Sequence, residues 1–522
     1  MPWTPEIIER MGMGGEPMFA LDFEDAPNPD TFDYRPERYV LHTHGIGGGR
    51  HIAHSLLSVT GPTQSVQIRS WYPSIGAVRA TLSGIEQAYW IARTIPRGML
   101  CTFKVGFAGI PFDKWADVGI YQYRGMRGAR NNWVMDFGDY FSYLQSRPAI
   151  GDYVDLFPDA GTDKEIAAGY TAASDTTLTF SSTADREVFT RDGAGGASGL
   201  LYAQPSSGQP FYLKHTGGSG ANLTVTASDV IDTTRVNLAS GDKVRALGYV
   251  NGGLTDILEK LLFRSTSSVG SMPDDSCLML FYDATTVDRD DWVRQSNRLA
   301  TIGGFTADFI AAAPLTNPWV AISDFFGAFG LWLVMRQGRL SFRTATDCDT
   351  GTDETLRIDA EITDLDIVSV EDQTLYHPDA REQMVQVNFP ITAFGETGGK
   401  AITMPSQGIF RHPSIEHVYG GTANKTNART HLSKRLLKWY TRIPMSITLN
   451  LLGWRWSTLV PGDIVQLKSN TIPDLIGPVT SFDTIKPITD RVFMVTSIAP
   501  DFANFTTSIT LTQLPPKSNP YT

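Results

Sequence analysis

Short stretches in which apolar and polar residues alternate recur along most of this 522-residue chain. In "QSVQIRSWYP", Val66 and Ile68 fall on one side of an extended backbone, whereas Gln67 and Arg69 fall on the other. Successive side chains of a strand point to opposite faces, so this alternation predicts β-strands. Similar stretches recur as far as "WVMDFGDYFSYL", which ends at residue 144, and we expect residues 1–150 to form one β-domain.

Residues 151–250 are rich in Thr, Ser, Gly and Ala, but they keep strand-sized apolar pieces. These pieces are "TTLTFSS", "QPFYLKH", "NLTVTAS" and "DKVRALGYV". Their spacing suits strands better than it suits a flexible linker, which is the alternative interpretation. We therefore expect a small β-domain inserted into a larger architecture.

Residues 251–365 combine helical spacing with a hairpin. "LTDILEKLLF" repeats leucine and isoleucine at helical intervals, "DRDDWVRQSNRLA" predicts a second helix, and Val320–Phe329 forms a third apolar run that Gly330 ends. The segments "LWLVMR" and "RLSFRT" then flank Gln337 and Gly338, which predicts a hairpin with a tight glycine-containing turn.

The last part, residues 366–522, begins with strands, continues with a polar-led helix near residues 420–443, and ends with strands. Pro461, Gly462 and Asp463 form a turn, because proline fixes φ, glycine permits the bend and aspartate hydrogen-bonds to loop amides. The fold class expected for the whole chain is mainly β with some α (α+β), divided into several domains.

The buried core is expected to draw on all three of the larger parts. Its predicted members are Leu254, Leu258, Phe325, Leu331, Leu333, Leu436, Ile447, Leu449, Ile464 and Val465.

Composition excludes several classes of protein. The net charge of −11 argues against a general nucleic-acid binder, because phosphate contacts need clustered Lys and Arg. Cys101, Cys277 and Cys348 are too few and too widely spaced for a disulfide framework or a zinc knuckle. The first residues lack the pattern of a secretory signal, and no apolar run reaches 18 residues, so we expect no membrane anchor and folding in a reducing cytoplasm.

The segment "HTHGIGGGRHIAH" holds four of the nine histidines, from His42 to His54. In a strand, His42 and His44 would point the same way, as two metal ligands must. The glycines match neither a dinucleotide-binding nor a P-loop fingerprint, and no carboxylate partner can be assigned. We interpret the segment as a Gly-rich loop between strands, with metal binding as the lesser alternative.

No recognised catalytic motif is present, and the acidic pairs, such as those in "DRDDW", are typical of solvated surfaces. We therefore expect no enzyme activity, no cofactor and no metal, with a hydrolase on a β-scaffold as an alternative. Trp71, Trp454 and Trp456 are candidate aromatic residues of an interface, and a sugar-binding platform is the other reading.

Two segments carry a resemblance to a known family. The first is "NPWVAISDFFGAFGLWLVMRQGRLSFR", and the second is "HLSKRLLKWYTRIPMSITLNLLGWRWSTLVPGDIVQLKS", followed by "RVFMVTSIAPD" and "TSITLTQL". This order of elements resembles the baseplate hub proteins at the tip of bacteriophage tails, which include siphophage tip-attachment proteins and contractile-tail hubs. The resemblance covers residues 1–150 and 251–522, and it leaves 151–250 as an insertion.

The resemblance implies a structural virion protein made of small β-barrel hub domains. Such hubs are homotrimers that join the distal tail protein ring to a central spike or fibre. Their lumen holds the end of the tape measure protein and later passes phage DNA without tight binding, to which an acidic chain is suited. A non-contractile tail is preferred. The alternatives are a distal tail ring protein or a receptor- or carbohydrate-binding tail-tip protein.

The resemblance also assigns places to the residues singled out above. Domains are expected at 1–150 (N-terminal barrel), 151–250 (insertion), 251–365 (helix and hairpin) and 366–522 (C-terminal barrel). Gly330, Gly338, Pro461, Gly462 and Asp463 set structural turns. Trp454 and Trp456 are expected to be exposed aromatics at the interface between copies.

Overall fold

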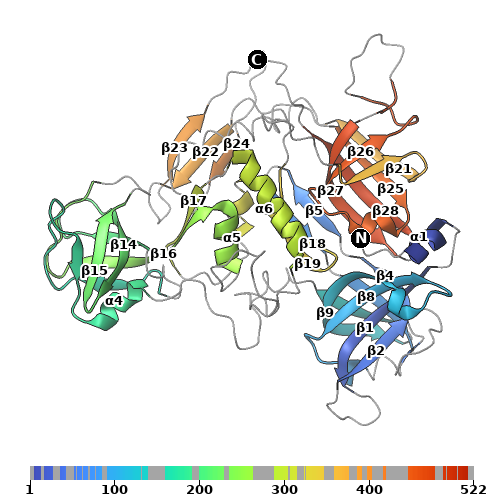
Figure 1. Cartoon of the computed structure of the whole chain (residues 1–522), viewed down its shortest axis with the longest axis horizontal. Coiled ribbons are helices and arrows are strands. Elements are labelled where there is room, and N and C mark those ends of the chain that lie inside the picture. The colour runs from blue at the N-terminus through green and yellow to red at the C-terminus, as the bar shows by residue number, and fades with distance from the viewer. Residues whose placement is uncertain are drawn as a thin grey trace.

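We analysed a computed structural model of the chain. The described residues are 5–12, 17–27, 36–42, 52–53, 56–138, 159–190, 199–262, 287–345, 358–375, 385–390, 397–402, 415–418, 445–475, 486–502 and 504–514, with gaps of one to eight residues inside the longer ranges. Figure 1 shows several β-units arranged around a central group of helices and a hairpin. The fold is mainly β with a few short helices, as the sequence predicts.

The first and last parts of the chain share one 16-stranded sheet. Its N-terminal strands are β1 (Pro17–Pro27), β2 (Pro36–His42), β3 (Ile52–Ala53), β4 (Leu56–Thr60), β5 (Gln64–Gln67), β6 (Tyr72–Ile75), β7 (Val78–Ser83), β8 (Leu100–Phe107), β9 (Ala116–Ala129) and β10 (Asn132–Gly138). Helix α1 (Pro5–Gly12) contacts β8. Strands β7 to β10 are antiparallel, and their inward-facing apolar residues form one core.

The C-terminal strands of the same sheet are β20 (Ala360–Thr363), β21 (Ile367–Leu375), β25 (Met445–Leu452), β26 (Ile464–Lys468), β27 (Arg491–Asp501) and β28 (Thr506–Gln513). In β25, buried residues alternate with partly exposed ones, which is the period-two pattern of a strand with one buried face. Strand β27 joins the two halves: it pairs with β26 and β28, and also with β4 and β5. Strands β22 (Val385–Pro390), β23 (Thr397–Ile402) and β24 (Ile415–Val418) form a separate sheet.

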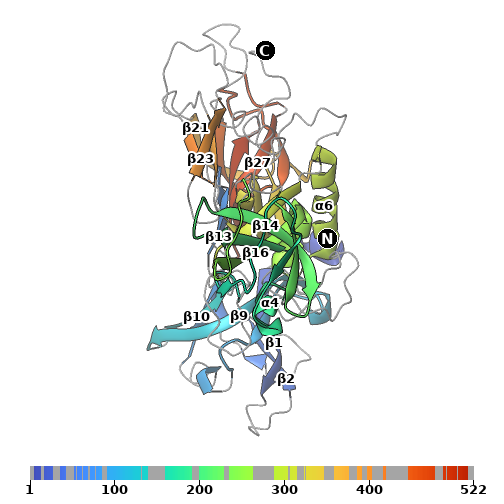
Figure 2. The same cartoon turned by 90° about the vertical axis from the view of Figure 1, so that its left-hand side faces the viewer.

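Residues 159–253 form a second β-unit with its own core. Its strands are β11 (Asp163–Glu165), β12 (Thr177–Thr179), β13 (Gly199–Gln204), β14 (Phe211–Ser219), β15 (Asn222–Ala227) and β16 (Lys243–Gly253), with helix α4 (Thr183–Thr190) packed against them. Figure 2 faces this unit. Strand β17 (Thr306–Ala311) pairs with the end of β16, so the sheet continues into the helical part of the chain.

The helical part contains α5 (Leu254–Leu262), α6 (Arg289–Gly303) and the hairpin of β18 (Leu331–Arg336) and β19 (Arg339–Thr344). Both faces of the hairpin are buried, and its core includes side chains from the N-terminal and C-terminal strands. The hairpin pairs with no strand outside itself among the described residues.

Nine of the ten residues predicted for the core are buried. The tenth, Leu436, lies outside the described residues together with the whole predicted helix near 420–443. Of the predicted helix Val320–Phe329, the described residues 322–323 and 325–327 are helical, whereas Phe329 already lies in the turn that continues through Gly330. Within the described part of the chain, we find no helix long and apolar enough to cross a bilayer.

Candidate functional site

Trp71, Gly330, Gly338 and the Pro461–Asp463 turn, all singled out from the sequence, gather around the β18–β19 hairpin, whereas Trp454 and Trp456 lie in other cores. Strand β5 and the loop that follows it reach the hairpin from the N-terminal part, and the turn at Pro461–Asp463 reaches it from the C-terminal part. Helices α5 and α6 contribute residues to the same core. We call this region the junction, and we define it by the hairpin, Gln64, Trp71, Asp291 and the Pro461–Asp463 turn.

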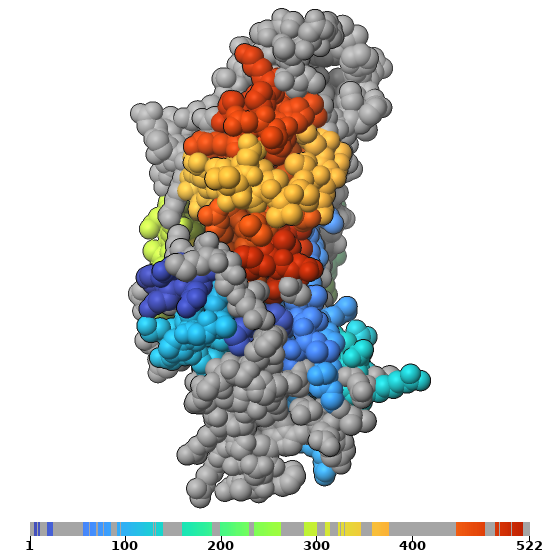
Figure 3. Space-filling model, turned by 90° about the vertical axis from the view of Figure 1, so that its right-hand side faces the viewer, coloured from blue at the N-terminus to red at the C-terminus, as the bar shows by residue number. Residues whose placement is uncertain are grey.

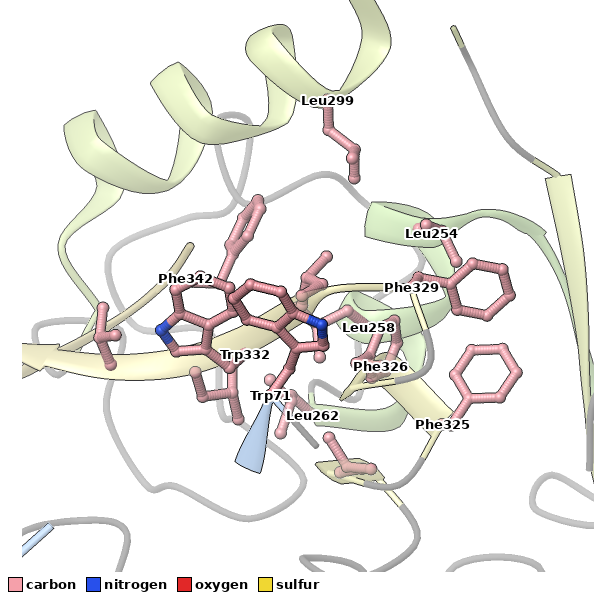
Figure 4. Close-up of a cluster of buried hydrophobic side chains, with 14 of the residues drawn as sticks. Trp71, Leu254, Leu258, Leu262, Leu299, Phe325, Phe326, Phe329, Trp332 and Phe342 are labelled. Atoms are coloured by element: carbon pink, nitrogen blue, oxygen red, sulfur yellow. The ribbon is translucent and has the colours of Figure 1, made fainter. Parts of the chain in front are cut away.

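Two tryptophans stack at the centre of the junction. The ring centroids of Trp71 and Trp332 are 5.2 Å apart, with an interplanar angle of 12°. Figure 4 shows the two rings side by side, near Phe342 and the leucines of α5. The Nε1 of Trp332 donates to the backbone oxygen of Pro461 at 3.1 Å. Three distant parts of the sequence therefore meet at one aromatic pair.

A side-chain amide completes the edge of the hairpin. The Nε2 of Gln64 donates to the backbone oxygen of Met335 at 2.8 Å, and the Met335 amide donates to Gln64 Oε1 at 3.3 Å. Both contacts are buried. The side-chain amide of Gln64 thus makes the two hydrogen bonds that a neighbouring strand would make with Met335. The backbone N–H and C=O of Met335 would otherwise be buried without partners, which costs free energy.

Arg343 is the buried cation of the junction, with 1% of its side chain exposed. Its Nε donates to Asp463 Oδ1 at 2.9 Å, and its Nη1 donates to Asp291 Oδ2 at 2.5 Å. Ser341 also donates to Asp291 Oδ2, at 2.7 Å. A buried ion pair stabilises a fold only when its geometry is good and further hydrogen bonds satisfy the ions. The Nε and Nη1 of Arg343 are both bonded, but its buried Nη2 has no hydrogen-bond partner among the described residues, so one donor of the guanidinium is left unsatisfied.

The charges of the junction shift the pKa values of its members. Burial alone would raise the pKa of Asp291, but the charge of Arg343, the hydrogen bonds from Ser341 and Arg343, and the charge of Arg294 lower it to about 2. Burial opposes the positive charge of Arg343, yet the carboxylates of Asp463 and Asp291 raise its pKa. Burial raises the pKa of Asp359, and the neighbouring Asp463 adds to that effect. Asp291 and Arg343 are therefore both charged at neutral pH.

The Pro461–Asp463 turn has the local geometry that its residue types favour. Asp463 Oδ2 accepts from the Val460 amide at 3.0 Å, and the Asp463 amide donates to the Val460 oxygen at 3.0 Å. Gly462 has φ +105°, which side-chain-bearing residues rarely adopt. A Cβ there would lie 2.7 Å from both Arg343 Cβ and Trp332 Cζ2, so the turn sits directly on the hairpin.

The other two predicted turn glycines also lie at contacts between parts of the chain. Gly338 has φ +77°, and a Cβ there would lie 2.1 Å from the backbone nitrogen of Ile120 in β9. Gly330 has φ +63°, and a Cβ there would lie 3.0 Å from the Cβ of Ala345 and 3.8 Å from the indole nitrogen of Trp71. Glycine is required at both positions for two reasons: the backbone has positive φ, and another part of the chain lies where a Cβ would be.

The expectation that Trp454 and Trp456 are exposed is wrong, and Trp71 is buried as well. Their exposed fractions are 0%, 3% and 1%. Trp454 packs against Phe107 of the N-terminal core, with ring centroids 5.3 Å apart, and Trp456 donates to the Leu452 oxygen at 3.0 Å. The physical reason is that large aromatic area is more stable buried, here between parts of one chain.

Sequence reasoning missed Arg343, Asp291 and Gln64. The local pattern gave no signal for Arg343, because Leu340 and Phe342 share one face of β19 and leave Arg343 on the opposite face with Ser341, where alternation predicts exposure. Of the His42–His54 segment, the structure describes the backbone of His42 and of residues 52–53, and the remaining residues lie outside the description. No cluster of metal-ligating side chains is found among the residues that the structure describes.

Comparison with known proteins gives three findings. No family model matches the chain, and no curated protein matches it. Solved structures that align with it include two prophage tail proteins and a chain of a gene transfer agent virion. The prophage MuSo2 43 kDa tail protein from Shewanella oneidensis is 10% identical, over 95% of this chain and 98% of that one, with a TM-score of 0.34.

The prophage tail protein gp18 from Listeria monocytogenes EGD-e is 8% identical, over 96% of this chain and 95% of that one, with a TM-score of 0.32. A chain of the native gene transfer agent virion is 13% identical, over 74% of this chain and 94% of that one, also at 0.32. TM-scores this low assign neither fold nor function, so the proposals below rest on the chain's own residues.

Proposed function

We propose that this chain is a structural subunit of a phage tail tip, and that it acts as a trimeric baseplate hub. In this proposal it joins the distal tail protein to a central spike or fibre, surrounds the tape measure protein and then passes DNA. The role is mechanical, without catalysis or a cofactor. Its location is the virion, after synthesis in the host cytoplasm.

The observation that carries the proposal is the fusion of the first and last β-units into one frame. Strand β27 hydrogen-bonds to β4 and β5 on one side and to β26 and β28 on the other. The junction then fixes the helical part to both units through the Trp71–Trp332 stack and the Arg343 ion pairs. Closely packed cores resist relative motion of the parts they join, as the subunit of a ring under mechanical force must.

The division at 1–150, 151–250, 251–365 and 366–522 is kept as part of this proposal. Residues 159–253 hold a self-contained core, which supports an insertion that decorates the frame. The other three ranges share a core, because Val66, Trp71, Val460 and Ile464 all pack around the hairpin. Their boundaries therefore divide the sequence and not separately packed units.

The symmetry of the assembled protein tests the proposal. The purified full-length chain is measured by light scattering across a concentration series, and particles are imaged by electron microscopy. A mass of three copies and threefold class averages with a central opening are expected. A sixfold ring would favour the distal tail ring alternative, and a single copy at every concentration would refute the trimer.

A further inference from the structure

The hairpin of β9 and β10 carries a concentration of positive charge that the proposed trimer does not by itself explain. Residues 121–133 contain Arg124, Arg127 and Arg130 and no acidic residue, in a chain of net charge −11. All three arginines are exposed, and Arg127 keeps 66% of its side chain exposed although it pairs with Asp136 at 3.3 Å. Figure 2 shows this hairpin projecting from the body of the molecule.

The tip of the hairpin also presents backbone that lacks a strand on one side. Strand β8 pairs with β9 from Ala116 to Gln122, whereas β10 follows β9 as far as Ala129. Among the described residues, no strand lies beside the outer edge of β9 beyond Tyr123. An unpaired edge is a template for a strand from another molecule unless something covers it.

Strand β21 offers a second open edge, of opposite charge. It pairs only with β25 within the described part of the chain, and it contains Glu371 and Asp372 but no basic residue. Apolar side chains are exposed around it: Leu365 91%, Val368 56%, Val370 43% and Leu452 51%. Figure 3 shows residues 358–375, in amber, on an open face of the molecule, while the β9–β10 tip projects to the side.

We propose that the β9 edge at the hairpin tip of one copy docks along the β21 edge of a second copy. Arginines of the tip would face Asp372 and Glu371, although Glu371 also accepts a hydrogen bond from Asn450 at 2.5 Å. The exposed parts of Met126 and Trp133, whose other parts pack on the N-terminal core, would meet the exposed apolar side chains near β21. This inference deepens the proposed trimer by naming its contact surfaces, and it rests on that proposal.

The contact joins two copies because one copy cannot make it with itself. Six strands separate β21 from β9 in the shared sheet. The seven steps between neighbouring strands, at about 4.8 Å each, place about 34 Å of sheet between the two edges. Two different surfaces in contact make a head-to-tail interface, and such an interface closes into a ring when the rotation allows it.

Charge reversal on the full-length chain tests the inference. Arg124→Glu with Arg127→Glu should weaken self-association at least tenfold in sedimentation velocity, because like charges then oppose each other across paired strands. Glu371→Arg with Asp372→Arg should do the same, and the four changes together should restore association to within about threefold of wild type. Lys243→Glu with Lys260→Glu, exposed changes in the 159–262 part, is the matched control and should leave association unchanged.

The outcomes separate the two proposals. If the wild type forms a trimer and both charge-reversed variants associate equally well, the docking inference is overturned while the hub proposal stands. If the wild type is a single copy at all concentrations, both fail. A tip that binds a duplex DNA probe in a salt-dependent way, with association unaffected by the β21 variant, would make a polyanion the partner and would overturn the docking inference.

Discussion

Substitution of Gly462 is the sharpest test of the junction. At φ +105° a side chain strains the backbone by about 1–3 kcal/mol. The added Cβ of Gly462→Ala would also lie 2.7 Å from the Cβ of Arg343 and from Trp332, both buried, and overpacking of this kind costs about 1–3 kcal/mol. We therefore expect a loss of about 2–6 kcal/mol in unfolding free energy, and a larger loss with impaired assembly for Gly462→Val.

Gly241 supplies the control for this experiment. It has φ +94°, close to that of Gly462, but a Cβ there would meet no atom within 4 Å. Gly241→Ala therefore reports backbone strain alone, and the difference between the two variants measures the contact with the hairpin. Denaturant unfolding followed by far-ultraviolet circular dichroism, which reports the strands of both β-units, gives both values. If Gly462→Ala destabilises the chain no more than Gly241→Ala does, the turn is not packed on Arg343, and our description of the junction is refuted.

Three further predictions concern ions and close approach. Asp291→Asn should destabilise the chain by about 3–5 kcal/mol in denaturant titration, because Arg343 loses one buried countercharge; an effect below 1 kcal/mol would show that the pair is solvated. Gly338→Ala should lower the thermal midpoint, since its Cβ would overlap the backbone of Ile120, and an unchanged midpoint would mean that the turn does not touch β9. Two buried groups should respond to acid at different pH. Burial lowers the pKa of His215 to about 4, so its stabilisation is complete above its ordinary pKa of 6.5 and is lost as pH falls through 4. Asp291, with a pKa of about 2, loses its contribution only below pH 4. Hydrogen exchange should show β14 opening at a higher pH than β19, and the reverse order would contradict this account.

Much of the fold follows from local pattern. The strands β25 and β28 alternate between buried and half-exposed residues, so period two was sufficient to locate them. The β18–β19 hairpin was predictable because two apolar runs flank Gln337 and Gly338. In the structure both residues adopt positive φ at a two-residue turn. The backbone conformation of a turn depends mainly on the residue types within it, which is why the turn positions were also predicted correctly.

The partners across the junction were not predictable in the same way. Arg343 meets Asp291 and Asp463, which lie 52 and 120 residues away in the sequence, and nothing in its own strand indicates either of them. The three tryptophans illustrate the same limit, since strand aromatics carry no local mark of whether they face another part of the chain or another molecule. Burial between distant segments is a property of the whole fold.

The pairing of β27 has a consequence for synthesis on the ribosome. Strands β4 and β5 are translated more than 400 residues before β27, which they need as a neighbour, and the N-terminal core is completed by Trp454 and Phe502. Until those late residues emerge, the early strands expose apolar side chains and an open edge, the state in which nascent chains aggregate or recruit chaperones. The completed frame can thus form only after residue 502 has left the ribosome, so the early strands wait for their neighbour while more than 400 residues are added.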